Sequence, residues 1–210
     1  MMTRSRTSSR WLKAHFNDAC VRAAHKQGYR SRAVYKLLEI DQRDRLLHRG
    51  MTVIDLGAAP GSWSQYCVER LGATGRVIAL DILPMQPLPG VEVLQADFRD
   101  AKTLTELINR VEGRPVHLVL SDMAPNISGV TAIDQPRAMR LAEEALELAC
   151  QVLVGNGSFL IKGFQGEGFD DYLQRLRECF RKVVIRKPKA SRERSREVYL
   201  LARHAVCSKV

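Results

Sequence analysis

Short aliphatic segments alternate with helical stretches along most of this 210-residue chain. Each segment is rich in β-branched or aliphatic residues and is bounded by Gly, Pro or Asp, which is typical of buried strands. The segments are "MTVIDL" (51–56), "GRVIALD" (75–81), "VEVLQAD" (91–97), "PVHLVLSD" (115–122) and "GSFLIKGF" (157–164). This alternation predicts an α/β domain with a mostly parallel sheet and helices on both faces.

Helical periodicity and two further strands complete the predicted order. Leu141, Ala145, Leu148 and Val152 recur at helical spacing within residues 135–154. Further helices are expected over "SRAVYKLLEIDQRD" (31–44) and near 169–180. The segments "KVVIRKP" (182–188) and "REVYLLARH" (196–204) predict a closing antiparallel hairpin. The sequence therefore predicts seven strands, of which the last is antiparallel.

The composition favours a compact protein that neither binds a metal ion nor spans a membrane. With 45% hydrophobic residues, 210 residues suffice for one sizeable core, and no apolar run reaches the length of a membrane span. The five cysteines are scattered without a C-x-x-C pair, and the five histidines have no ligand spacing. We expect reduced thiols, no metal and a cytoplasmic monomer. The Arg- and Ser-rich opening leaves a short organellar transit peptide as the alternative.

Positive charge is concentrated at the two ends of the chain. Residues 1–36 contain nine Lys or Arg and one acid, and residues 175–210 contain twelve and three. Residues 37–174 contain twelve Lys or Arg and nineteen acidic residues. Basic ends around an acidic centre indicate a polyanion-binding surface, and nucleic acid is the commonest such partner. Solubilising charge, the alternative, does not explain why both clusters are terminal. We expect a basic N-terminal extension over residues 1–30 that contacts RNA, followed by one domain over residues 31–210.

A glycine-containing turn follows the first predicted strand, in "DLGAAPGSWSQ" (55–65). Such a turn lets a ligand approach the backbone, and the helix that follows offers free N–H groups. Ala, Ala and Pro separate Gly57 from Gly61 and no G-K-[ST] follows, so the turn is neither a dinucleotide fingerprint nor a P-loop.

Two acids at later strand ends suggest what the turn binds. Asp81 can accept hydrogen bonds from both ribose hydroxyls, and Asp97 can accept one from an adenine amino group. A carboxylate-lined pocket without a basic phosphate clamp fits a nucleoside that carries a positive sulfonium, as S-adenosylmethionine does. A lone acid at a strand end is often only a cap, and a tryptophan such as Trp63 is more often a core anchor. Position favours the functional interpretation, since Gly61, Asp81 and Asp97 all fall at the ligand-binding edge of the predicted sheet.

Lys162 is an amine at the end of an apolar strand, where an unpaired charge would be unfavourable. Asp122 ends the "LVLSD" strand at the same sheet edge, so the two side chains can approach each other. The expected hairpin adds Glu197 to this edge. Lys36, on the helix before the first strand, is a fourth candidate, although a solvated helix face would be the favoured interpretation without the other three residues.

The chain resembles the FtsJ family of S-adenosylmethionine-dependent ribosomal RNA 2'-O-ribose methyltransferases. The resemblance rests on the order and spacing of several motifs from about residue 11 to 203. These are "YRSRAVYKLLEID", "DLGAAPGSWSQ", "SDMAPNISG", "PRAM", "KGFQGEGFD" and "RKPKASRERSREVY". It implies a Rossmann-like methyltransferase fold and, as substrate, a uridine ribose of large-subunit ribosomal RNA within the assembled large ribosomal subunit.

The resemblance also implies site residues. The catalytic tetrad of the family falls on Lys36, Asp122, Lys162 and Glu197. Its cofactor contacts fall on Gly61, Trp63, Asp81, Asp97 and Asp122. From the basic ends we expect phosphate contacts that weaken steeply with salt. The candidates are Arg30, Arg32, Lys187, Arg194 and Arg196.

Several alternatives stay open at this point. The substrate could be another RNA, such as transfer RNA or an mRNA cap, or the chain could be a non-catalytic RNA-binding assembly factor. A base methyltransferase is disfavoured because "SDMAPNISG" has neither an N-P-P-Y type motif nor a Pro-Cys nucleophile. A nicotinamide dehydrogenase is disfavoured because the sequence lacks the dinucleotide-binding fingerprint. Lys162 could take the proton of the hydroxyl group or position the oxygen while the proton leaves to water.

Overall fold

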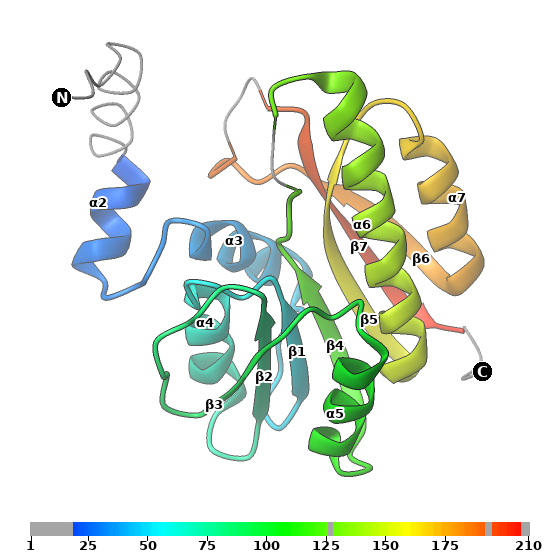
Figure 1. Cartoon of the computed structure of the whole chain (residues 1–210). Coiled ribbons are helices and arrows are strands. Elements are labelled where there is room, and N and C mark those ends of the chain that lie inside the picture. Colours follow the sequence, from blue (N-terminus) through cyan, green and yellow to red (C-terminus); the bar gives the residue numbers. More distant parts are fainter. Residues whose placement is uncertain (1–18, 126–127, 192–194, 207–210) are drawn as a thin grey trace, which may run out of the picture.

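The computed structural model of the chain describes residues 19–125, 128–191 and 195–206. In this part of the chain a seven-stranded sheet has the order β3-β2-β1-β4-β5-β7-β6 (Figure 1). Strands β1 to β5 run parallel, and β7 lies antiparallel between β5 and β6. The strands are β1 (Thr52–Leu56), β2 (Arg76–Asp81), β3 (Val91–Gln95), β4 (Val116–Ser121), β5 (Leu153–Phe164), β6 (Phe180–Arg186) and β7 (Glu197–Ala205). The predicted fold class and closing hairpin are confirmed.

Helices cover both faces of the sheet. Among the described residues they are α2 (Ala19–Lys26), α3 (Val34–Asp44), α4 (Ser62–Leu71), α5 (Ala101–Val111), α6 (Thr131–Val152) and α7 (Phe169–Cys179). Helix α2 forms inside the segment expected to be a basic extension, and the division at residue 30 stays a prediction. Strand β5 begins earlier than predicted. Val116 pairs with Leu153 but Leu118 pairs with Ser158, so the extra residues form an irregularity at the start of β5.

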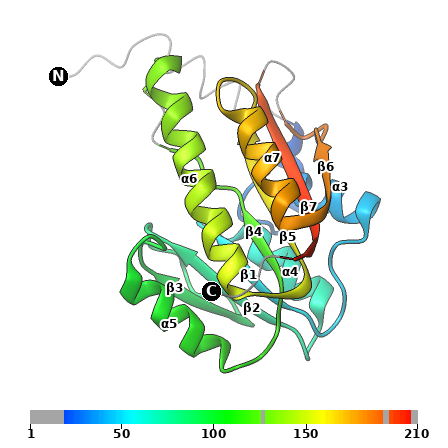
Figure 2. The same ribbon diagram turned by 90° about the vertical axis from the view of Figure 1, so that its right-hand side faces the viewer.

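Two hydrophobic clusters separate the faces of the sheet. Helices α3 and α4 pack on one face, and α5, α6 and α7 pack on the other. Figure 2 shows α6 and α7 on the near side of the sheet, with α3 and α4 beyond it. Leu120, Leu160 and Leu201 point toward α3 and α4. Because side chains alternate along a strand, residues two positions away from these leucines point to the same face. Asp122, Lys162 and Tyr199, which belong to the site described below, therefore point toward α3 and α4.

Asp41, near the end of α3, joins that helix to its surroundings. Its side chain is 1% exposed, and its Oδ1 accepts hydrogen bonds from the backbone N–H groups of Leu46 and Leu47 at 2.8 and 2.7 Å. Its Oδ2 accepts from the Tyr66 hydroxyl at 2.8 Å and from Arg70 Nε at 3.1 Å. These four bonds compensate for burying the carboxylate and fix α3 against α4.

Asp44 fixes the same end of α3 to the sheet. The guanidinium of Arg186 on β6 donates to both carboxylate oxygens at 2.7 and 2.6 Å, and Arg203 on β7 donates to the Asp44 backbone oxygen. The hydrogen bond from Arg186 holds the pKa of Asp44 below its usual range, although burial acts in the opposite direction. Helix α3, which carries Lys36, is therefore held to α4 and to strands β6 and β7.

Candidate active site

Three polar side chains follow one another across the ends of β4, β5 and β7. Ser121 pairs with Ile161, so the next residues, Asp122 and Lys162, are neighbours across the sheet. Lys162 in turn pairs with Tyr199. By the alternation along each strand, all three side chains point to the α3/α4 face.

Lys162 is held directly by Asp122. Its Nζ donates to the backbone oxygen of Asp122 at 2.5 Å and lies 3.2 Å from the carboxylate Oδ1. The Lys162 side chain is only 9% exposed, and that of Asp122 is 18% exposed. A carboxylate at this distance offsets the desolvation of the ammonium. The predicted approach of these two residues is therefore observed, and it explains how a strand end tolerates an amine.

Lys36 and Glu197 form the second pair of the site. The Lys36 Nζ lies 2.7 Å from Glu197 Oε1, with side chains that are 12% and 14% exposed. The Ser191 hydroxyl donates to the same oxygen at 2.9 Å. Burial alone would raise the pKa of Glu197. The charge and hydrogen bond of Lys36, the bond from Ser191 and the charge of Lys162 outweigh burial and lower it. The four residues of the predicted tetrad thus lie in one cluster.

Tyr199 lies between the two pairs and is not among the residues predicted from sequence. Its hydroxyl donates to Asp122 Oδ1 at 2.6 Å, and the Lys36 Nζ lies 5.5 Å from the centre of its ring. Burial, followed by the charges of Asp122 and Glu197, raises the pKa of Tyr199 well above its usual value. The hydroxyl therefore remains a donor. Its position two residues after Glu197, on the same strand face, was the signal that could have identified it.

Beside this cluster, the turn after β1 and the loop after β2 lie against each other, and we call the region between them the crevice. Gly57 and Gly61 have φ angles of 71° and 106°, and Gly61 caps the N-terminus of α4. A Cβ on Gly57 would lie 2.3 Å from Met123 Cγ, and one on Gly61 would lie 2.8 Å from Met85 Sδ. Both positions therefore favour glycine, because the backbone is in the left-handed region and the methionine side chains pack closely against it.

Asp81 connects the two walls of the crevice. Its carboxylate accepts the backbone N–H groups of Ala59 at 2.9 Å and of Leu83 at 2.8 Å, one on each oxygen. Each oxygen keeps a further lone pair for a ligand hydroxyl. The side chains of Ile82 and Leu83 are 62% and 59% exposed beside it. A carboxylate next to exposed apolar side chains suits the ribose and base of a nucleoside.

Asp55, at the end of β1, adds a buried carboxyl group to this edge. The Ser64 hydroxyl donates to its Oδ2 at 2.7 Å, whereas its buried Oδ1 has no hydrogen-bond partner among the described residues. Burial raises the pKa of Asp55 to about 7. The bond from Ser64 opposes this, and the charges of Asp122 and Asp81 add to it. Asp55, Asp81 and Asp122 therefore lie close enough to interact electrostatically at this edge.

Two predicted cofactor contacts have partners within the protein. The Trp63 ring is 3% exposed, and its Nε1 donates to the Ala33 oxygen at 2.8 Å, so the residue anchors α4 to the segment before α3. Asp97 accepts three side-chain hydrogen bonds from Arg99 Nε and Nη2, which lower the pKa of Asp97 although burial opposes them. Cofactor contact stays a prediction for both residues.

The predicted RNA-binding residues differ in their surroundings. Arg32 donates to the Ala190 oxygen at 2.9 Å, and Lys187 donates to the oxygens of Ser195 and Glu197. Arg196 lies 3.5 Å from the Thr131 hydroxyl at the start of α6. Arg194 lies outside the described residues, as do the basic residues of positions 1–18. Arg30 lies at the crevice, where it donates to three backbone oxygens. RNA contact stays a prediction for all five.

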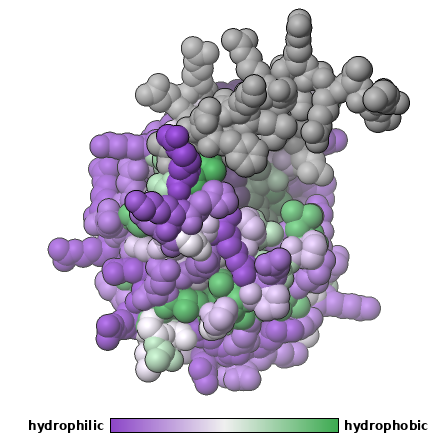
Figure 3. All heavy atoms as spheres, turned by 90° about the vertical axis from the view of Figure 1, so that its left-hand side faces the viewer, coloured by the Kyte–Doolittle hydropathy of each residue, from purple (hydrophilic) through white to green (hydrophobic). Residues whose placement is uncertain are grey.

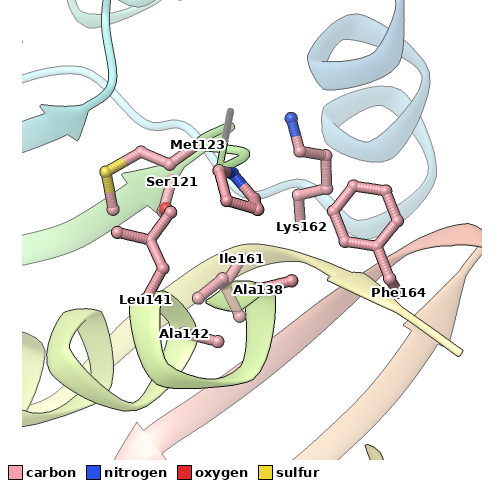
Figure 4. Close-up of a pocket in the computed structure, with 9 residues that line it drawn as sticks. Ser121, Met123, Ala138, Leu141, Ala142, Ile161, Lys162 and Phe164 are labelled. Atoms are coloured by element: carbon pink, nitrogen blue, oxygen red, sulfur yellow. The ribbon is translucent and has the colours of Figure 1, made fainter. Parts of the chain in front are cut away.

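A small cavity lies between the ends of β4 and β5 and helix α6. Figure 4 shows Lys162 and Phe164 from β5 on one side of it, with Leu141 and Ala142 from α6 below. Its volume is about 10 Å³, which is room for about one water molecule. The cavity is therefore too small to hold a nucleobase.

Within the described residues, no group of three or more His, Cys, Asp or Glu side chains could hold a metal ion. No helix in this same part of the chain is long and apolar enough to cross a membrane.

Comparisons with known proteins agree with this geometry. The model of the FtsJ-like methyltransferase family matches residues 29–205. The Ribosomal RNA large subunit methyltransferase E of Alkalilimnicola ehrlichii is 61% identical over 196 residues, which cover 93% of this chain and 94% of that protein. A crystal structure from Plasmodium falciparum, assigned as a ribosomal RNA methyltransferase, has a TM-score of 0.78 at 26% identity and covers 86% of this chain and 100% of its own. A Clostridium thermocellum structure assigned as an rRNA methylase shares the fold, with a TM-score of 0.55 at 16% identity over 81% of this chain and 97% of its own. The chain belongs to the FtsJ-like methyltransferase family.

Proposed function

We propose that this methyltransferase transfers a methyl group from S-adenosylmethionine to the 2'-hydroxyl of a uridine in large-subunit ribosomal RNA, within the assembled large subunit. The observation that carries the proposal is the joint placement of Lys162, Asp122, Lys36 and Glu197 beside the crevice. The name of the 61% identical relative supports the choice of ribosomal RNA. The resemblance to the FtsJ family supports the 2'-hydroxyl of a uridine.

The crevice fits the proposed cofactor on its own residues. Gly57 and Gly61 have no side chains that would keep a ligand from the turn, and Asp81 offers lone pairs suited to the two ribose hydroxyls. Asp55 and Asp122 place two further carboxyl groups near this edge. When bound, S-adenosylmethionine supplies an electrophilic methyl group on a positively charged sulfur.

Lys162 can orient the attacking oxygen. An ammonium has three N–H donors, of which one points to the Asp122 backbone oxygen and a second can serve its carboxylate. The third remains for the 2'-oxygen of the ribose. A donor held in this way aligns the hydroxyl and stabilises the negative charge that develops on the oxygen, while its proton leaves to water.

The other residues fix Lys162 in this role. Asp122 cannot turn away freely, because the Tyr199 hydroxyl holds the oxygen that faces Lys162. Glu197 is held by Lys36 and Ser191, and its negative charge balances the two lysines. Two ammonium groups and two carboxylates leave the cluster close to neutral, so it can be desolvated by the incoming RNA at moderate cost.

The RNA would be held by the basic ends of the chain. The side of the molecule that carries α2 is mostly hydrophilic, with scattered hydrophobic residues (Figure 3). Such a surface suits contacts to phosphates and sugars rather than burial of a protein partner. On the assembled subunit, the basic segments at the two ends of the chain would contact phosphates on both sides of the site at the same time.

The proposal is tested with purified protein, labelled S-adenosylmethionine and large subunits from cells that lack the gene. We expect label in ribosomal RNA that appears as 2'-O-methyluridine after nuclease digestion. Lys162→Ala should lose the transfer and keep its affinity for the cofactor within about twofold. Lys182→Ala, which removes an exposed lysine from β6, is the matched control. Label in a base, or no label with wild-type protein, would refute the proposal.

A further inference from the structure

Arg30 bridges the two loops that form the crevice. Its Nη1 donates to the backbone oxygen of Pro60 at 3.0 Å, in the turn after β1. The same guanidinium reaches the loop after β2, where Nη1 donates to the Gln86 oxygen at 2.8 Å and Nη2 to the Pro87 oxygen at 2.8 Å. One side chain thus fixes the distance between the two walls.

The segment around Arg30 is itself fixed to α4. The backbone N–H of Arg30 donates to Gln65 Oε1 at 2.8 Å, and the Gln65 amide donates to the Gly28 oxygen at 3.1 Å. The Ser31 and Ser62 hydroxyls lie 2.8 Å apart. Figure 1 shows the link between α2 and α3 next to α4. The guanidinium is therefore presented from a rigid base.

The loop that Arg30 holds contains little structure of its own. Residues 82–90 form neither helix nor strand, and most of them are exposed. The loop follows Asp81, and its Met85 packs over Gly61 at the opposite wall. A shift of this loop would move the Leu83 N–H away from the Asp81 carboxylate, where it donates at 2.8 Å.

We infer that Arg30 is a positioning residue for the cofactor crevice, and that it acts by holding the loop after β2 against the turn after β1. This inference rests on the proposed function, because the crevice is taken to receive S-adenosylmethionine. Three N–H donors of a planar guanidinium meet three carbonyl oxygens on two separate loops. A lysine side chain is shorter than that of arginine and has no second nitrogen for the Pro87 oxygen, so it cannot make these three bonds together.

Bridging two loops is a different role for Arg30 from binding an RNA phosphate. A phosphate contact depends mainly on charge, so a lysine at position 30 would preserve most of it. Bridging depends on the shape of the guanidinium, so lysine would fail almost as alanine does. The two roles therefore predict opposite results for Arg30→Lys.

The experiment compares Arg30→Ala and Arg30→Lys with wild type and with Arg22→Ala, which removes an exposed arginine from α2. Calorimetry should show the Kd for S-adenosylmethionine raised about tenfold in both Arg30 variants and unchanged in Arg22→Ala. KM for the cofactor should rise in parallel, with kcat at saturating cofactor within about twofold of wild type. Rescue of cofactor affinity by lysine would overturn the inference, as would wild-type affinity in Arg30→Ala.

Hydrogen exchange in the cofactor-free protein keeps the test independent of the proposed function. Amides of residues 82–90 should exchange faster in both Arg30 variants, while those of β1 and β4 should not. Unchanged exchange in the loop would refute the bridge even if no cofactor bound. Failure of the wild-type protein to bind S-adenosylmethionine would refute the proposed function and leave the bridge supported by faster exchange. RNA affinity should keep its salt slope, whereas loss of one phosphate contact would lower the slope by about 0.7 to 0.9.

Discussion

Replacing Lys36 with methionine tests how the site is held together. Methionine keeps much of the apolar stem and removes the ammonium, so Glu197 loses a partner at 2.7 Å while its side chain stays only 14% exposed. Removing one member of a buried pair typically destabilises a protein by about 3–5 kcal/mol, because the other charge is left uncompensated. Ser191 still donates to Glu197, so we expect the lower end, about 3 kcal/mol. For a chain of this size that is a loss of roughly 6–12 °C in Tm.

The loss should depend on pH in a defined direction. In the wild type the pKa of Glu197 is lowered, so the stabilisation is present above its unfolded value of about 4.3 and is lost as pH falls through the folded pKa. Without Lys36, burial is opposed only by Ser191 and Lys162, so the pKa of Glu197 should be higher than in the wild type and the variant should gain relative stability on protonation. The difference between Lys36→Met and wild type should therefore be largest near neutral pH and shrink toward about pH 4.

The assay is urea unfolding followed by circular dichroism at neutral and acid pH, with a double-mutant cycle. Lys36→Met with Glu197→Gln removes both charges and should recover to within about 1 kcal/mol of wild type. Methyl transfer should stay lost in the double variant, which separates stability from function. Additive losses in the cycle, or a loss that grows toward acid pH, would refute the reasoning.

Three further results are expected. Asp41→Ala leaves two backbone N–H groups and the Tyr66 hydroxyl without their acceptor. Urea unfolding should therefore show a free energy of unfolding that is lower by about 3–5 kcal/mol. A decrease below about 1 kcal/mol would contradict the buried network. Tyr199→Phe removes the donor to Asp122. Single-turnover methyl transfer should therefore slow about tenfold, with unchanged affinity for the cofactor. A wild-type rate would show that the hydroxyl has no part in the site. RNA affinity of the wild type should fall steeply between low and physiological salt, and a flat dependence would exclude the proposed phosphate contacts.

The sequence predicts the sheet well because burial and turn chemistry are local signals. Alternating aliphatic segments predict all seven strands, and the shared edge of parallel strands brings Asp122 to Lys162 although they are 40 residues apart. The start of β5 was less predictable. Leu153 continues the apolar pattern of α6, and only its pairing with Val116 makes it a strand residue.

Contacts that depend on the tertiary structure could not be predicted from residue types. A buried tyrosine such as Tyr199 looks like any core aromatic until its hydroxyl finds Asp122. Arg30 counts as one more positive charge in a basic segment, and only the fold shows that it donates to the carbonyl oxygens of two loops. Asp41 carries no motif, because its four donors come from two separate segments, the loop after α3 and helix α4.

The most direct test of the whole account is single-turnover methyl transfer to large subunits, with Lys162→Ala compared with wild type at saturating S-adenosylmethionine. The ammonium of Lys162, held by Asp122, is taken to align and stabilise the 2'-oxygen. The account predicts a fall in the transfer rate of at least about a thousandfold, with cofactor affinity close to wild type when it is measured well below the Tm. The Tm itself should fall, because Asp122 loses its buried partner. A rate within about tenfold of wild type would contradict it.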